Sequence, residues 1–224
     1  MWVILPFLVW TIGVLCWHGW ASEYGHTSPA QPSIQAAVLQ TTILWGAGLA
    51  FTSELLSLFH ALTRSGVGLV WAIALGWLCV VGLRGGYLQR GARLVGEKLR
   101  SISWSDWVLL GVLGVLSSTL LFIVLTSLSG NLDSLHYHLS RIMHWAQNAS
   151  LRHYATAVVQ QLYNPIWAEE AMLHLRLLWG NDQFAGMVQW GAMVSSLVAV
   201  TLIATELKVG RQGQWIAVAF AFSL

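Results

Sequence analysis

The sequence predicts an all-α polytopic integral membrane protein: a helical bundle with amphipathic helices in one extracytoplasmic loop. Hydrophobic residues make up 56% of the 224 residues and charged residues only 9%, against roughly 25% in a typical soluble domain. The mean hydropathy of +0.64 agrees with this class. The apolar residues are grouped in long runs, and a membrane helix needs about 20 of them. A net charge of +2 is too small to indicate a nucleic-acid partner.

Three apolar runs precede residue 107, at about 2–17, 36–62 and 67–83. The first has no Lys or Arg before it, which favours a retained span over a cleaved signal peptide. The second contains Glu54, for which we expect an interfacial position near Arg64 because a charge inside the membrane is costly. Cys16 and Cys79 lie in apolar runs, where buried thiols are the common finding.

A basic segment, 84–103, follows the third run and contains Arg84, Arg90, Arg93, Lys98 and Arg100. Short loops rich in Lys and Arg stay cytoplasmic, so this segment predicts the orientation of the protein. Residues 1–106 are thus expected to form the first part of the chain, with about three spans, and Met1 outside.

The second predicted part, 107–224, begins with a span at 107–132 that contains no charged residue and leads to Asp133 on the outer face. An extracytoplasmic helical loop at 133–183 and a span at 184–205 follow. Lys208 and Arg211 predict a second cytoplasmic loop. The apolar run at 213–224 is too short to cross, so the chain is expected to be the N-terminal part of a longer protein.

The loop 133–183 holds five of the eight histidines and four of the nine acids, and is the predicted site of chemistry. At about 100° per residue, a helix over 132–147 would have a polar face and an opposite face of Leu135, Leu139, Ile142 and Ala146. The polar face would comprise Asp133, His136, Tyr137, Ser140 and His144. One interpretation is a juxtamembrane helix with a solvated face. The other makes Asp133 a general base, with the neighbouring residues orienting it or binding phosphate.

A second helix is expected to start near Pro165 with Asn164 as its N-cap, and to end at Gly180. Glu169 and His174 on this helix are candidates for a second polar wall of a cavity. The basic residues of the loop are Arg141, Arg152 and Arg176. They suit phosphate binding, and interfacial positions or ion pairs with Glu169 or Glu170 are equally open.

A metal site has little in its favour. The His136–His138 pair has a suggestive spacing, but on a helix the two side chains point about 200° apart and do not hold one ion together. We therefore predict no cofactor, with a divalent metal as a weakly supported alternative.

An ordered series of residues between Trp107 and Trp190 resembles bacterial membrane glycosyltransferases of the GT-C superfamily. The nearest likeness is to the branch of protein O-mannosyltransferases and lipid A aminoarabinose transferases. The series is Asp133, Tyr137-His138-Leu139, Arg141, Trp145, Gln147-Asn148, Tyr154, Gln161-Leu162, Pro165, Ala168-Glu169, Asp182 and Gln189-Trp190. It departs from the family pattern at Ser134, where many relatives have a second acid, and at Ser140, where proline is often found.

The resemblance implies a multi-pass enzyme of the bacterial plasma (inner) membrane that uses a polyprenyl-phosphate-linked sugar and an acceptor glycan, lipid or protein. Asp133 would be the catalytic base of an inverting transfer. The substrate-binding candidates are His136, Tyr137, Arg141, His144, Arg152, Glu169 and His174. Two alternatives stay open: another lipid-linked glycan enzyme, of the O-antigen polymerase or ligase type, and a transporter or scaffold without enzymatic activity.

Overall fold

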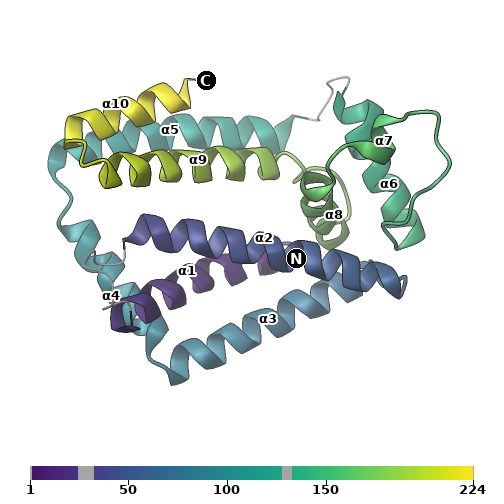
Figure 1. Cartoon of the computed structure of the whole chain (residues 1–224), viewed down its shortest axis with the longest axis horizontal. Coiled ribbons are helices and arrows are strands. Elements are labelled where there is room, and N and C mark those ends of the chain that lie inside the picture. Colours follow the sequence, from purple (N-terminus) through teal and green to yellow (C-terminus); the bar gives the residue numbers. More distant parts are fainter. Residues whose placement is uncertain (1, 25–32, 128–132, 224) are drawn as a thin grey trace. The chain divides into compact units, whose positions relative to one another are not determined.

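The computed structural model describes residues 2–24, 33–127 and 133–223, and these form ten α-helices and one π-helical turn, without a strand in the described segments (Figure 1). Five of the helices are long and apolar enough to cross a membrane. They are α1 (Ile4–Tyr24), α2 (Ile34–Leu58), α3 (Arg64–Arg84), α5 (Trp104–Thr126) and α9 (Met187–Glu206). The predicted all-α class of a membrane protein is confirmed.

The helix ends differ from the predicted ones by a few residues. Helix α2 ends at Leu58 rather than residue 62, because His60 adopts a left-handed backbone conformation (φ 51°) and turns the chain. Helix α5 begins at Trp104, where the Ser103 hydroxyl caps it by accepting from the Asp106 amide (3.4 Å). The predicted ends of two spans, Leu132 and Leu224, lie outside the described residues.

The chain packs as two compact units. The first contains Met1–Phe7, Gly46–Ala74 and Gly114–Trp190, and the second contains Leu8–Trp45, Leu75–Leu113 and Gly191–Leu224. The sequence predicts two parts, 1–106 and 107–224. Each compact unit contains segments from both of these parts.

In the second unit, the basic segment forms helix α4 (Tyr87–Arg100), which packs against α1. Helix α10 (Arg211–Phe222) contacts the start of α5 through Asp106. This buried carboxylate accepts from Trp215 Nε1 (2.7 Å) and the Ser103 hydroxyl (2.5 Å), and forms an ion pair with Arg211. The contact joins the start of α5 to the start of α10 within this unit.

In the first unit, helix α8 (Trp167–Trp179) packs against the parts of α2 and α3 that belong to this unit. Trp167 Nε1 donates to the Gly46 carbonyl (3.2 Å). The start of α9 is joined to α5 by a hydrogen bond from Trp190 Nε1 to the Ser117 carbonyl (3.0 Å). These contacts attach α8 and the start of α9 to other helices of the same unit.

Candidate functional site

The segment 133–183, called here the polar module, folds into four short helical elements. These are the π-turn η1 (Ser134–His138), α6 (Leu139–Asn148), α7 (Gln160–Tyr163) and α8. Helix α8 begins at Trp167, two residues later than predicted, and ends as predicted at Gly180, which has a left-handed conformation (φ 108°).

The expected single helix over 132–147 is instead divided between η1 and α6. The amide of Leu139 donates to the Ser134 carbonyl, an i→i+5 bond typical of a π-turn. The Ser140 hydroxyl donates to the Leu135 carbonyl (2.6 Å). The wide turn changes the rotation of the residues that follow it, compared with one regular helix. Leu135 is 57% exposed, and the buried residues of α6 are Arg141, Ile142 and Trp145.

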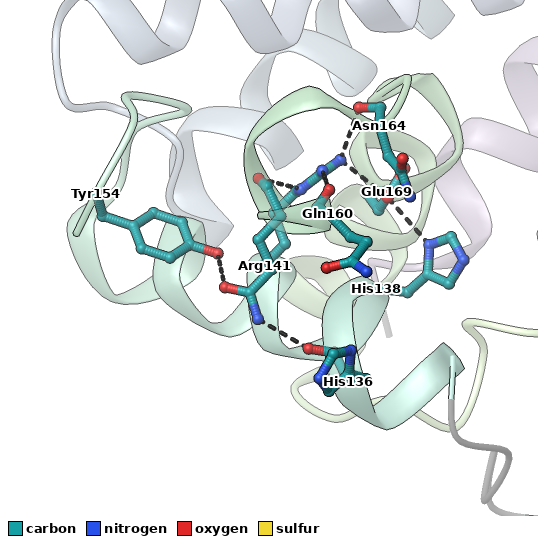
Figure 2. Close-up of polar contacts among 8 residues, drawn as sticks. His136, His138, Arg141, Tyr154, Gln160, Asn164 and Glu169 are labelled. Atoms are coloured by element: carbon teal, nitrogen blue, oxygen red, sulfur yellow. Dashed lines mark hydrogen bonds and ion pairs between the residues drawn. The ribbon is translucent and has the colours of Figure 1, made fainter. Parts of the chain in front are cut away.

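Arg141 is the centre of the module (Figure 2). Its side chain is 0% exposed, and it donates to three backbone carbonyls and one carboxylate. The bonds are Nε to Gln161 O (2.9 Å), and Nη atoms to Gln160 O (2.6 Å), Asn164 O (3.2 Å) and Glu169 Oε1 (3.0 Å). A guanidinium has five N–H groups, so almost all of its donors are used inside the protein.

The side chain of Gln161 forms a second connection inside the module, between the loop after α6 and η1. Its amide oxygen accepts from the hydroxyls of Tyr154 (2.9 Å) and Thr156 (3.0 Å), and its amide nitrogen donates to the His136 carbonyl (2.8 Å), as Figure 2 shows in part. One hydrogen bond from α7 therefore attaches η1, the turn that directly follows Asp133, to the rest of the module.

Glu169 links α8 to α6 and to η1. Its Oε1 atom lies 3.0 Å from the Arg141 guanidinium and 3.0 Å from Nδ1 of His138. The carboxylate is 0% exposed, and its Oε2 atom has no partner among the described residues. Glu169 and Arg141 thus form a buried ion pair that holds α6, α7 and α8 together.

His174 anchors the module to the helices of the same unit. Trp71 Nε1 on α3 donates to Nδ1 (3.0 Å), and Ser53 on α2 lies 3.0 Å from Nε2. Because an indole N–H only donates, Nδ1 is the acceptor and the neutral ring carries its proton on Nε2. Burial lowers the pKa of His174 to about 3, so this ring stays neutral at any physiological pH.

The predicted site residues separate into two groups. Arg141, Glu169 and His174 are buried and bind other parts of the protein. Asp133, His136 and Arg152 are exposed, and Tyr137 and His144 are half-buried. Tyr137 lies against His138 (ring centroids 4.0 Å apart), and His144 stacks on Tyr154 (3.9 Å, 21°).

Asp133 differs from every other carboxylate of the module. It is exposed and has no hydrogen-bond or ion-pair partner among the described residues. Glu169 is bound to Arg141, Glu170 is buried, and Asp182 forms an ion pair with Arg176. Within the described part of the module, Asp133 is therefore the one carboxylate that is both fully exposed and without a protein partner.

Glu170 provides a pH-dependent contribution to stability. It is 2% exposed, and its Oε2 atom has no partner among the described residues. Burial, and then the negative charges of Glu54 and Glu169, raise its pKa to about 7. In the unfolded chain, the Glu170 carboxyl ionises near its ordinary pKa of about 4.5. The contribution of Glu170 to the free energy of unfolding is therefore fully present below that pH and is lost as the pH rises towards 7.

We expect wild-type protein to lose about 2 kcal/mol between pH 5 and pH 8 from this group, and Glu170→Gln to remove that part of the loss. Thermal unfolding in detergent at several pH values measures the difference. Glu206→Gln, at an exposed position at the end of α9, is the matched control and should follow the wild type. A parallel decline of Glu170→Gln and wild type would contradict the assignment.

Sequence reasoning missed several polar residues that organise the module. Ser53 and Trp71 lie inside apolar runs, and no local pattern distinguishes them from other span residues. The buried hydrogen bond between Ser57 and Ser150 (3.1 Å) likewise joins α2 to the loop after α6 across a long sequence separation. These contacts come from tertiary packing, which periodicity does not encode.

The described residues contain no group of three or more His, Cys, Asp or Glu side chains that could hold a metal ion. His138 faces Glu169, whereas the His136 side chain is exposed, so the two histidines do not converge.

Comparison with known proteins gives no relative: no protein-family model matches the chain, and neither a curated protein nor a solved structure is significantly similar to it.

Proposed function

We propose that this chain belongs to a membrane glycosyltransferase that moves a sugar from a polyprenyl-phosphate-linked donor to an acceptor hydroxyl on the extracytoplasmic face. The observation that carries the proposal is the state of Asp133, an exposed carboxylate without a protein partner among the described residues. The order of residues that resembles the GT-C superfamily agrees with it, because the same aspartate is the base that the resemblance implies.

The chemistry requires a group that removes the proton of the acceptor hydroxyl while the oxygen attacks the anomeric carbon. A carboxylate within hydrogen-bond reach of the hydroxyl performs this step. The bond from the anomeric carbon to the lipid phosphate breaks, and the phosphate leaves with the electron pair. Attack from the opposite side inverts the configuration of the sugar.

The leaving phosphate needs positive charge or hydrogen-bond donors. Arg152 is exposed, and its guanidinium has no partner among the described residues, while His136 is exposed on η1 beside Asp133. We propose these two for the phosphate, since a guanidinium matches phosphate oxygens with paired donors. Tyr137 and His144 are proposed as flanking contacts. Arg141, Glu169 and His174 support this arrangement from inside the module.

A second candidate has a specific observation in its favour. Two exposed basic residues, Arg152 and His153, lie together in the loop after α6. A lipid-linked glycan polymerase or ligase would depend on such residues more than on one acid, and its donor carries a diphosphate.

The donor distinguishes the two candidates. Full-length protein in vesicles should consume a labelled polyprenyl-monophosphate sugar with transfer to an acceptor hydroxyl. Consumption of a polyprenyl-diphosphate glycan alone would replace the first candidate by the second, and turnover of neither lipid would reject both enzymes.

Cysteine labelling tests the side of the membrane, in a protein with Cys16 and Cys79 replaced by Ala. Ala157→Cys in the exposed loop after α6 should react with an impermeant maleimide from outside. Gln89→Cys, exposed on α4, should react only after permeabilisation. The opposite pattern would place the polar module in the cytoplasm and overturn the donor class.

A further inference from the structure

Helix α4 has a surface that the proposed function does not use. One side of it touches α1 in the second unit. A methyl group added at Gly19 of α1 would overlap the Tyr87 carbonyl, and one added at Gly91 would overlap the Leu15 carbonyl. The two backbones are therefore in direct contact, and this side of α4 is occupied by protein.

The rest of the helix has an apolar side and a side that carries three arginines, Arg90, Arg93 and Arg100, with one exposed acid, Glu97. At 100° per residue, Ala92, Val95 and Leu99 lie together, and Ala92 and Leu99 are exposed, the latter to 46%. Arg93 and Arg100 lie beside them on the next side, exposed and without a partner among the described residues. Arg90, by contrast, forms an ion pair with Glu23 of α1.

Exposed aromatic side chains lie near both ends of α4 in this unit. Trp104 and Trp107, which follow it in the chain, are 82% and 45% exposed. Trp20 and Tyr24 of α1 flank the Glu23 that pairs with Arg90, and they are 42% and 56% exposed. Figure 1 shows α4 beside the end of α1, between α3 and α5 in the chain. Trp and Tyr are enriched where a membrane meets water.

We propose that α4 lies in the membrane interface and binds the headgroups of anionic phospholipids through Arg93 and Arg100. Its apolar side would enter the acyl region, as in other interfacial helices with a basic face. The occupant follows from charge complementarity and from the aromatic side chains, which place the arginines at headgroup depth. A soluble anion would not explain the exposed Leu99 next to them.

The test compares lipids in vesicles that contain the whole chain. Trace spin-labelled phosphatidylglycerol and phosphatidylcholine report how strongly each lipid associates with the protein. Wild type is expected to prefer phosphatidylglycerol, and Arg93→Gln/Arg100→Gln should lower the preference by about fivefold for each arginine. Arg64→Gln/Lys208→Gln removes the same charge at exposed positions outside α4 and should keep the preference.

An equal loss in both double variants would overturn the proposal, because it would show a general effect of net charge. If wild type shows no preference for phosphatidylglycerol over phosphatidylcholine, the proposal is wrong, and the basic residues of α4 indicate only the orientation of the chain in the membrane. Wild type alone gives an independent test, since a headgroup contact weakens as salt increases. Inorganic phosphate that displaces phosphatidylglycerol better than sodium chloride of equal ionic strength would indicate a soluble-anion site instead.

Discussion

Asp133→Asn is expected to lower the rate of sugar transfer by about 10²–10⁴-fold while the protein stays folded in the membrane. The exposed side chain of Asp133 makes no hydrogen bond or ion pair with the described residues, so its replacement by an amide of the same shape removes no structural contact. An amide cannot accept the acceptor's proton. The loss should therefore appear in kcat, with the KM for the lipid donor almost unchanged.

The matched control is Asp182→Asn, which removes a carboxylate from the same module. Asp182 forms a partly exposed ion pair with Arg176, and such pairs contribute about 0–1 kcal/mol. We expect nearly normal transfer by this variant. Unchanged transfer by Asp133→Asn, combined with loss in Arg152→Ala, would remove the general-base role and favour the polymerase or ligase class.

The spans were predictable because their physical cause is local. A run of about 20 apolar residues between polar segments is sufficient for a membrane helix, whatever the rest of the chain does. The same holds for the end of α8 at Gly180, where a left-handed residue stops the helix. Differences of a few residues arise at the ends, where a cap such as Ser103 decides the first turn.

The interior of the polar module was not predictable in the same way. The helical period placed Leu135 on the apolar face. Spacing alone did not decide whether Arg141 binds phosphate, lies at the interface or pairs with Glu169 or Glu170. The π-turn at 134–138 changes the direction in which the residues of α6 face. No residue type in that segment predicts the turn. The acceptors of Arg141 lie at Gln160, Gln161 and Asn164, which approach it only when the module is folded. Tertiary hydrogen bonds thus decide which arginine is buried.

Arg141→Met is expected to destabilise the polar module by about 3–5 kcal/mol, because it leaves the buried Glu169 carboxylate without its guanidinium partner. Three backbone carbonyls also lose their donor. The apparent Tm in detergent should fall by about 6–20 °C. Hydrogen exchange should become faster in α6, α7 and α8, and less affected in α4 and α10, which belong to the second unit.

Arg152→Met is the control, since it removes an exposed arginine of the same module and should change stability by less than about 0.5 kcal/mol. The double variant Arg141→Met/Glu169→Gln tests the cause. If the uncompensated carboxylate produces most of the loss, its neutralisation restores part of the stability, and the double variant is more stable than Arg141→Met alone. The contrary result is a double variant whose loss of stability equals the sum of the losses of the two single variants. The two side chains would then act independently, and Arg141 would stabilise the module through the carbonyls of α7 rather than through the ion pair.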